Sequence, residues 1–369
     1  MTVGYFSPLP PAPTGVAAYS AALIPALREH CEVLMNAAGA DVALYHLGNN
    51  HLHRFIYRTA FETPGVIVLH DAVLNHFFLG TLGREEYIDE FVYNYGEWHR
   101  GVAGELWDAR SRSAADPLYF KYPMLRRVCE CSRAVIVHNP AAARMVREHA
   151  PAARVYEIPH LFVPPPALPA AAATRWRERH GIAPKTCLFG VLGHLRETKR
   201  LHSTLGAFER ARAAGADAAL LIAGGFASSD LERALAPALA RPGIVRKPHA
   251  PEGEFHLMMS AVDACINLRY PSAGETSGIA IRMMGIGKPV ILTADEAVSR
   301  FPEGACLRVD AGPAEGEMLA EYMSLLAASP ATRAEIGRRA AEHIASRHAL
   351  ERVARSYSEV LCEHARREV

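Results

Sequence analysis

Short runs of apolar and β-branched residues alternate along the chain with longer stretches whose apolar positions recur at helical spacing. This alternation is typical of βα units that build parallel sheets. The first half of the chain predicts strands at residues 3–6, 32–35, 42–45, 66–69, 134–137 and 155–158. The second half predicts strands at residues 187–192, 219–223, 264–268, 289–292 and 307–309. We therefore expect an α/β protein with two Rossmann-like, doubly wound parallel sheets.

The two series of strands are separated by a segment rich in proline and alanine, which begins Phe162-Val-Pro-Pro-Pro-Ala-Leu-Pro and continues with four alanines. Proline continues neither a strand ladder nor the interior of a helix, so the βα rhythm stops here. We expect an amino-terminal domain over residues 1–163, a linker over 164–180 and a carboxy-terminal domain over 181–345. The remaining residues, 346–369, are predicted to form a helix that packs back on the amino-terminal domain.

Length and charge narrow the class of protein. The 369 residues suit two domains, and a half-hydrophobic composition is ordinary for globular proteins. The net charge is only +1 and no long basic run occurs, so a nucleic-acid partner is not expected. The first residues lack the features of a signal peptide, and no stretch approaches the roughly 20 apolar residues that span a bilayer. We expect a cytoplasmic protein, and peripheral contact with the inner face of the membrane stays open.

The seven cysteines do not indicate a disulfide framework or a zinc site, because their number is odd and no Cys-x-x-Cys occurs. His51 and His53 lack the acidic and histidine spacing of a known metal motif. No metal site is expected.

Several polar residues follow predicted strands, where ligands of parallel α/β sheets bind. Gly15 opens a helix whose free backbone N–H groups could face an anion or a sugar, with a plain proline-rich turn as the alternative. The third strand leads into His46-Leu-Gly-Asn49-Asn50-His51-Leu-His53, whose side chains suit sugar hydroxyls, although a polar turn with an asparagine cap explains them too. His70-Asp71 follows the next strand, and Asp71 has a helix cap as its alternative role. His138-Asn139-Pro140 follows another, and there we interpret Asn139 as a helix cap.

The second half carries more specific motifs. Its first strand leads into Gly193-His194-Leu-Arg196-Glu-Thr-Lys199-Arg200, which places three cations within five residues beside a helix start. Such a loop suits a diphosphate, and a solvated basic helix start is the alternative. The segment 246–249 is expected to contact a nucleotide base, again with solvated charge as the alternative.

The segment 268–291 is the strongest local motif. A strand ends in a loop with Glu275-Thr276-Ser277-Gly278, and a helix of small residues then leads to Gly287-Lys288-Pro289 and another strand. Glycine lets the backbone approach a ligand, the helix start offers N–H groups to a phosphate, and Glu275 offers a carboxylate to sugar hydroxyls.

Together these motifs resemble those of the retaining glycosyltransferases of family four, the glycogen-synthase-like group with the GT-B fold. Residues 275–278 match the family's Glu-Gly-Phe-Gly, 287–291 its Gly-x-Pro-Val-Ile, and 193–200 its Gly-Arg-Leu-x-x-x-Lys-Gly. The Gly-Glu-Thr-Ser-Gly form is similar to a divergent branch of the group. The family's second acidic position falls on Arg282 or Met283, so the ribose lacks its usual carboxylate. The resemblance extends over about residues 1–360.

The resemblance implies two domains facing a central cleft, with roles for particular residues. Catalytic roles fall on Lys199, Arg196, Glu275 and His70. Donor-binding roles fall on Gly15, His194, Thr276, Ser277, Gly278 and Arg282. Acceptor-binding roles fall on Asn49, Asn50, His53 and Asp71.

The implied reaction moves a hexosyl group from a nucleotide-diphosphate sugar to a glycan, lipid-linked or small-molecule acceptor, with retention, as in polysaccharide biosynthesis. Lys199 and Arg196 would neutralise the phosphate as the glycosidic bond breaks, and that phosphate would take the acceptor's proton. The resemblance implies neither a metal nor a cofactor. The sequence indicates no particular sugar, base, linkage or oligomeric state.

Three other functions stay open. A catalytically inactive nucleotide-sugar-binding protein would explain the missing second glutamate, and a sugar-nucleotide epimerase can share the two-domain architecture. A dinucleotide-dependent oxidoreductase shares the βα rhythm, but no Gly-x-Gly-x-x-Gly follows any predicted strand.

Overall fold

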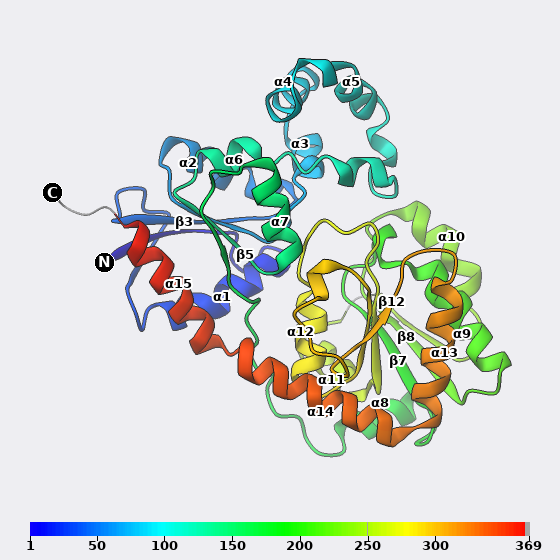
Figure 1. The fold of residues 1–369 in the computed structure, drawn as a ribbon. Helices are drawn as coiled ribbons and strands as arrows, with labels where there is room; N and C mark the ends of the chain where they lie inside the picture. Colours follow the sequence, from blue (N-terminus) through cyan, green and yellow to red (C-terminus); the bar gives the residue numbers. More distant parts are fainter. Residues whose placement is uncertain (249, 366–369) are drawn as a thin grey trace. The chain divides into compact units, whose positions relative to one another are not determined.

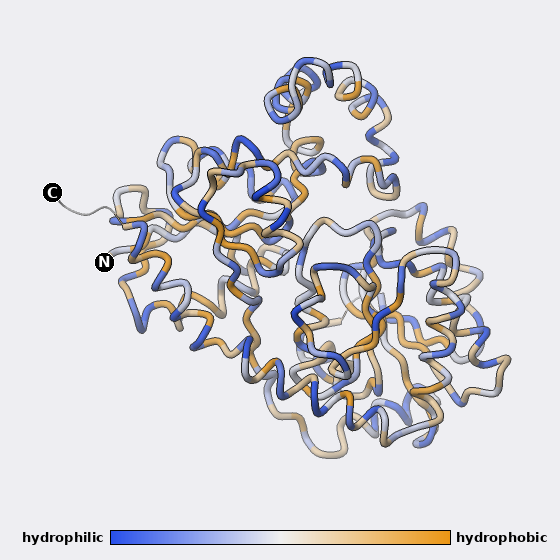
Figure 2. Tube along the Cα trace, in the orientation of Figure 1, coloured by the Kyte–Doolittle hydropathy of each residue, from blue (hydrophilic) through white to orange (hydrophobic). Residues whose placement is uncertain are grey.

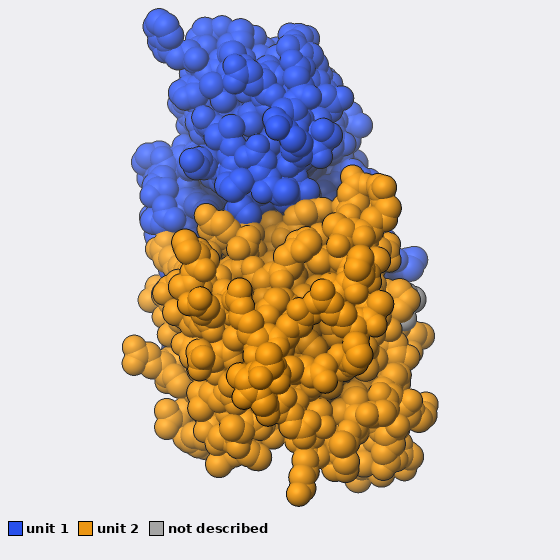
Figure 3. Space-filling view, turned by 90° about the vertical axis from the view of Figure 1, so that its right-hand side faces the viewer, with its two compact units in different colours: residues 1–161, 271–276, 347–369 blue, residues 162–270, 277–346 orange. Residues whose placement is uncertain are grey.

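The computed structural model describes residues 1–248 and 250–365, and the chain divides into two compact units. Unit 1 comprises Met1–Leu161, Pro271–Thr276 and Arg347–Val369, and unit 2 comprises Phe162–Tyr270 and Ser277–Ser346 (Figure 3). Residue 249 and the end of the predicted final helix, 366–369, lie outside the described residues. Each unit is built on a six-stranded parallel sheet flanked by helices, so the predicted doubly wound α/β fold is confirmed over the described residues.

The sheet of unit 1 has the strand order β2-β1-β3-β4-β5-β6, with every neighbouring pair parallel. Its strands are β1 (Thr2–Phe6), β2 (Glu32–Met35), β3 (Val42–Leu47), β4 (Val66–Leu69), β5 (Ala134–Val137) and β6 (Val155–Glu157). The α-helices of this unit are α1 (Gly15–Leu27), α2 (Arg54–Glu62), α3 (Asn75–Thr81), α4 (Arg84–Tyr95), α5 (Arg100–Asp108), α6 (Arg126–Glu130), α7 (Pro140–His149) and α15 (Leu350–His364). Short 3-10 helices are η1 (His51–His53), η2 (Glu97–His99), η3 (Arg110–Arg112) and η4 (Pro117–Lys121).

Both faces of this sheet are covered, which explains why its central strands read as continuous apolar runs rather than alternating ones. Tyr5 faces a core shared with α1 and α15, whereas Phe6 faces a core shared with α2 through α7. The hydroxyls of Tyr19 in α1 and Tyr357 in α15 lie 2.9 Å apart. The carboxy-terminal helix α15 therefore belongs to the amino-terminal sheet. Between β4 and β5, α3 to α5 extend away from the rest of unit 1 (Figure 1).

The sheet of unit 2 has the order β12-β11-β10-β7-β8-β9, again with all neighbouring pairs parallel. Its strands are β7 (Cys187–Leu192), β8 (Ala218–Ala223), β9 (Ile244–Lys247), β10 (Ala264–Asn267), β11 (Val290–Thr293) and β12 (Leu307–Val309). Its helices are α8 (Ala172–Arg179), η5 (Glu197–Lys199), α9 (Leu201–Ala213), α10 (Ser229–Leu239), α11 (Glu252–Ala261), α12 (Gly278–Gly285), η6 (Glu296–Val298), α13 (Glu315–Ala328) and α14 (Pro330–Arg347). Figure 2 shows the apolar strands inside each unit and the polar positions toward the helix surfaces.

Two features of unit 2 differ from the sequence prediction. The strand β9 had no predicted counterpart, because Ile244-Val245-Arg246-Lys247 has only two apolar residues and lies half-buried at the sheet edge. The alanine-rich part of the expected linker is the start of α8, which buries Trp176 in the core of unit 2. The alanines therefore act as helix formers, which agrees with their high helix propensity.

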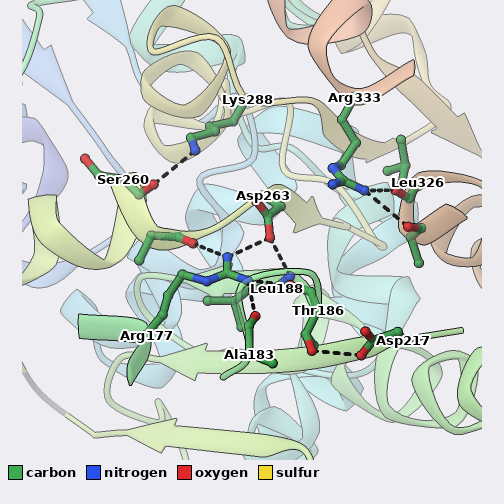
Figure 4. A network of polar contacts seen from close by, with 12 residues as sticks. Arg177, Ala183, Thr186, Leu188, Asp217, Ser260, Asp263, Lys288, Leu326 and Arg333 are labelled. Atoms are coloured by element: carbon green, nitrogen blue, oxygen red, sulfur yellow. Dashed lines mark hydrogen bonds and ion pairs between the residues drawn. The ribbon is translucent and has the colours of Figure 1, made fainter. Parts of the chain in front are cut away.

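A polar network fastens α8 to the amino edge of the second sheet (Figure 4). Arg177 donates to the Asp263 carboxylate at 2.7 Å and to the backbone oxygens of Ala261 and Thr186. The same carboxylate accepts the Leu188 N–H at 2.7 Å. Arg177 thus supplies the counter-charge of Asp263 and hydrogen bonds to backbone carbonyl groups near the core.

We expect Arg177→Met to lower the free energy of unfolding by about 2–4 kcal/mol, because it leaves a half-buried carboxylate without its counter-charge. Chemical denaturation, followed by circular dichroism, measures this change. Arg175→Met on the exposed side of the same helix is the matched control and should change stability by less than about 0.5 kcal/mol. Equal effects of the two substitutions would contradict this role for Arg177.

Candidate functional site

The carboxyl edge of the second sheet is shaped by two glycines. Gly193 follows β7 with φ +85°, and Gly224 follows β8 with φ +138°. A Cβ atom at Gly224 would lie 2.0 Å from the carbonyl oxygen of Gly193. Only glycine permits this close approach of the two backbones. The strand order also changes direction between β7 and β10, and ligands of such sheets bind beside this switch point.

Lys199 lies buried at this edge, in the loop that follows β7. Its ammonium group donates to the carbonyl oxygen of Leu192, and no carboxylate among the described residues forms an ion pair with it. Burial, helped by the nearby cations Arg269 and Arg196, lowers the pKa of Lys199 from 10.5 to about 7. An amine held this way gains from an anionic ligand, because such a ligand would supply the missing counter-charge.

The start of α12 lies beside this lysine. Ser277 caps the helix by accepting the N–H of Ala280 at 3.3 Å, and Arg269 lies 3.5 Å from the Ser277 hydroxyl. A Cβ atom built on Gly193 would be 3.6 Å from the Lys199 Nζ and 3.3 Å from Cγ1 of Ile279 in the first turn of α12. Lys199 and the first turn of α12 therefore lie beside Gly193, and Arg269 lies beside the Ser277 cap of the same helix. This arrangement suits a phosphate or diphosphate.

The other cations of this loop are not equivalent. His194 and Arg196 are largely exposed. The pKa of His194 is lowered by partial desolvation of its ring and then by the positive charges of Arg196 and Lys199. Arg200 adopts φ +57° and turns its guanidinium to the buried Glu315 carboxylate at 2.9 Å. Of the three cations in the sequence motif, Arg200 thus forms an internal ion pair, while Arg196 reaches solvent.

The remaining predicted donor residues of unit 2 lie on α12. Gly278 is its first residue, and Arg282 lies half-buried in its last turn, where its side chain has no polar partner among the described residues. In the segment 246–249, which is expected to contact a nucleotide base, the arginine binds within the protein instead. Arg246 donates to the backbone oxygens of Ile222 and Gly224 at 3.2 and 2.6 Å, and residue 249 lies outside the described residues. The Arg246 guanidinium is therefore used within the sheet edge.

The segment Pro271–Thr276, which carries Glu275 and Thr276, groups with unit 1. The Asn139 side-chain amide donates to the carbonyl oxygen of Gly274 at 2.8 Å and to the Thr276 hydroxyl at 3.0 Å. The Glu275 carboxylate accepts the N–H of Ala273 at 2.8 Å. Asn139 also caps α7 by accepting the Ala142 N–H, so the sequence interpretation as a cap describes half of its role. The other half is to hold the segment that bears Glu275.

Gly274 in this segment adopts φ +69°, and a Cβ atom there would lie 2.8 Å from the Cβ of Ala72 and 3.2 Å from the Met145 sulfur. We expect Gly274→Ala to destabilise unit 1 by about 1–3 kcal/mol, through both the left-handed conformation and the overlap with Ala72. Thermal unfolding measures this effect. Gly15→Ala is the matched control, because nothing lies within 4 Å of a Cβ at Gly15 and the residue starts a helix. A Gly274→Ala protein as stable as wild type would show that the segment does not need this close packing.

The predicted acceptor residues lie at the carboxyl edge of the first sheet. The Asp71 carboxylate accepts the Asn49 N–H at 2.9 Å, and the Asn49 side chain accepts the Phe77 N–H at 2.7 Å. Asn50 caps η1, as the alternative interpretation proposed. Asp71 is not the cap of α3, which begins after Leu74. His53 is fully buried, with Nδ1 2.9 Å from the carbonyl oxygen of His46, so we assign it to loop packing rather than to acceptor contact.

A cluster of histidines lies beside these loops. The sequence analysis noted His46 and His138 after their strands but assigned a functional role only to His70. The strand ends β3 to β6 bring His46, His70, His138 and His160 around the Tyr19 ring. The Nδ1 of His46 is 2.9 Å from the Nε2 of His70. Burial, and then the neighbouring histidines, hold the pKa of His70 well below 6.5, so its ring is neutral. A histidine at or just after each of four successive strands was the sequence feature that could have revealed the cluster.

Among the described residues, no group of three or more histidine, cysteine or acidic side chains is arranged to hold a metal ion. No helix in the described part of the chain is long and apolar enough to cross a membrane.

Comparisons with known proteins extend this picture. No protein-family model matches the chain, and no curated protein sequence is significantly similar to it. Among solved structures, HepE from Anabaena in complex with UDP-glucose has a TM-score of 0.64 at 16% identity, over 98% of this chain and 100% of that chain. Sucrose-phosphate synthase from Thermosynechococcus elongatus has a TM-score of 0.58 at 16% identity, over 87% of this chain and 72% of that one. WaaG, a glycosyltransferase involved in lipopolysaccharide biosynthesis, has a TM-score of 0.57 at 13% identity, over 98% and 99% of the two chains. The chain therefore has the α/β fold of the GT-B glycosyltransferases.

Proposed function

We propose that this protein is a retaining glycosyltransferase that uses a nucleotide-diphosphate sugar as donor. The observation that carries the proposal is Lys199, a buried lysine without a carboxylate partner among the described residues, at the switch point of the second sheet. Arg269 and the start of α12 lie beside it and add positive potential. This combination fits the diphosphate of a donor.

In the proposed reaction, negative charge grows on the diphosphate as the glycosidic bond breaks. Lys199, Arg196 and the N–H groups at the start of α12 stabilise that charge, which is larger in the transition state than in the bound donor. The departing phosphate oxygen takes the proton of the acceptor hydroxyl, whose oxygen attacks from the same face of the sugar. Glu275 and Thr276 contact the donor sugar, and the polar edge of the first sheet binds the acceptor.

The experiment that tests this function starts from nucleotide recognition. HepE has been solved with UDP and with UDP-glucose, which makes UDP the first nucleotide to test. A thermal-shift screen with UDP, GDP, ADP, CMP and dTDP, followed by the matching sugars, identifies the donor. Product analysis by NMR then shows whether the anomeric configuration is retained. Stabilisation without transfer to any acceptor would favour an inactive nucleotide-sugar-binding protein, and a free epimerised nucleotide sugar would indicate an epimerase.

We further propose that the transfer needs no metal ion, because Lys199, Arg196, Arg269 and a helix start offer positive potential at the diphosphate site. Transfer rates measured with EDTA and with added Mg²⁺ or Mn²⁺ are expected to agree within about twofold. In a metal-dependent transferase the ion itself neutralises the diphosphate, so EDTA would abolish transfer. Loss of transfer in EDTA that is restored by a divalent ion would overturn this part of the proposal.

A further inference from the structure

His46 and His70 form a hydrogen-bonded pair within unit 1, with the His46 Nδ1 2.9 Å from the His70 Nε2. His46 is fully buried in β3, and its ring stacks against Tyr5 at 4.8 Å and His70 at 5.2 Å. His70 lies just beyond β4 and keeps part of its surface exposed. The pair therefore joins a buried ring to one that reaches the edge of the sheet.

Only one of these two nitrogens can carry the shared proton. Which one carries it depends on the surroundings of the other His46 nitrogen, Nε2. The His46 Nε2 is buried and has no hydrogen-bond partner. If His70 donated to His46, the His46 proton would sit on that Nε2 as a buried N–H without an acceptor. A buried N–H without a partner is rarer and less favourable than an unused lone pair, so the other arrangement should outweigh it about tenfold or more.

The proton of the pair thus lies on the His46 Nδ1, and the His70 Nε2 accepts it. A neutral His70 then carries its own proton on Nδ1. Both rings are neutral, because burial and the neighbouring histidines hold each pKa well below its usual value. The His70 Nδ1 makes no hydrogen bond among the described residues. Because His70 is only half-buried and this nitrogen is not one of the fully buried atoms, solvent or a ligand can reach it.

The geometry points to His46 as a positioning residue that fixes His70 in the Nδ1–H tautomer, so that this N–H donates to an oxygen of the bound substrate. The role in substrate binding rests on the proposed transferase function, whereas the tautomer does not. One consequence is chemical: His70 is excluded as a general base, since its Nε2 lone pair is occupied by His46 and its Nδ1 already bears a proton. His70 instead contributes one oriented donor for a sugar hydroxyl or a phosphate oxygen.

The neighbouring histidines follow the same logic. His53 and His138 both place Nδ1 at a backbone oxygen, 2.9 Å from His46 and 3.0 Å from Ile158. Each must donate there, which leaves its buried Nε2 as a bare lone pair. Unlike these two, the His70 Nδ1–H has no backbone oxygen as a partner among the described residues. It is this difference that His46 maintains.

The tautomer is measured by NMR on the ligand-free full chain, produced with isotope-labelled histidine, because ring carbon and nitrogen shifts differ between the two neutral forms. His70→Gln and His46→Gln assign the two signals. We expect the Nδ1–H form for His70 in the wild type. Replacement by His46→Phe keeps an aromatic ring beside Tyr5 but removes the donor, and it should shift His70 toward the Nε2–H form or a mixture. Replacement by His46→Asn keeps a donor near the Nδ1 position and should restore the Nδ1–H form. Finding the Nε2–H form in the wild type, or no change in His46→Phe, overturns the assignment.

A binding measurement with UDP-glucose as probe tests the consequence. We expect His46→Phe to weaken binding about tenfold and His46→Asn to recover most of that loss. In a His70→Ala background, His46→Phe should have no further effect, which a purely structural role of His46 would not produce. Additive losses would overturn the positioning role. If neither UDP-glucose nor another nucleotide sugar binds the wild type, the proposed function fails, while the NMR result still decides whether His46 sets the tautomer.

Discussion

Lys199→Met is expected to weaken strongly the thermal stabilisation by the nucleotide that the wild type recognises. A charged hydrogen bond to the diphosphate is worth about 1.5–3 kcal/mol, so affinity should fall about 10- to 150-fold. Transfer should fall further, by about 10²- to 10³-fold, because the lysine also stabilises charge that develops during bond breaking. The ligand-free variant should be at least as stable as wild type, since the substitution removes a buried charge that has no carboxylate partner among the described residues. Thermal shift and calorimetry with UDP measure these effects.

Lys288 provides the matched control for this variant. It is half-buried, burial also lowers its pKa, and its amine donates to the Ser260 oxygen at 3.0 Å. It precedes β11, however, whereas Lys199 follows β7, so the two lysines lie at opposite edges of the parallel sheet. Lys288→Met should keep the full nucleotide shift. If both variants kept the shift, or both lost it, the diphosphate would not be bound by Lys199 in the way proposed.

The pH dependence of nucleotide binding is a separate test of the charge on Lys199. With a pKa of about 7 in the free protein, a large fraction of the amine is neutral above that pH. A bound diphosphate favours the protonated amine, so binding takes up a proton and affinity should fall by up to about tenfold per pH unit above pH 7. Lys199→Met should remove this dependence. The comparison separates the charge of the lysine from its packing.

The fold was predictable from the sequence because buried parallel strands leave a strong apolar pattern. Every strand from β1 to β8 lies within two residues of its predicted bounds. The missed strand β9 shows the limit of that pattern, since an edge strand with two cations in four residues looks like a loop. The alanine run was assigned to the linker because prolines precede it. Its last two residues, Ala172 and Ala173, instead begin α8, which buries Trp176 in unit 2.

The candidate site was predictable only in part, because tertiary pairing decides which loops meet. Lys199 was identified from its motif, but Arg269 becomes relevant only because β10 pairs with β7 and brings the two loops together. Asn139 was read as a local cap, since nothing near it in sequence shows that it also binds Gly274 and Thr276, which lie 135 and 137 residues away. His53 looked like a polar ligand, yet its loop turns the ring inward against Gly48.

Mild acid is expected to unfold unit 1 before unit 2. Burial lowers the pKa of His53 and His138 from 6.5 to about 4, whereas in the unfolded chain both titrate near 6.5. As the pH falls below 6.5, these histidines bind protons in the unfolded state but not in the folded state. Their contribution to the free energy of unfolding is therefore fully present above pH 6.5 and is lost toward pH 4. Each shift corresponds to on the order of 3 kcal/mol, and the two together approach the total stability of a typical domain, about 5–15 kcal/mol. His46 and His70 act in the same direction.

Tryptophan fluorescence can follow the two units separately. Trp107 packs half-buried against the core of unit 1, Trp176 is buried in unit 2, and the almost fully exposed Trp98 contributes little change. In single-tryptophan variants, the Trp107 denaturation midpoint should fall steeply between pH 6.5 and 4, and the Trp176 midpoint much less. His138→Asn keeps a donor for the Ile158 oxygen but cannot titrate, so it should reduce the pH slope by about one proton. The exposed His51 is the control position, where asparagine should leave the slope unchanged. Two outcomes would contradict this role of the buried histidines: a parallel loss of both tryptophan signals, or an unchanged pH slope in His138→Asn. In either case the histidines would bind protons equally in the folded and unfolded states, and they would not set the pH at which unit 1 unfolds.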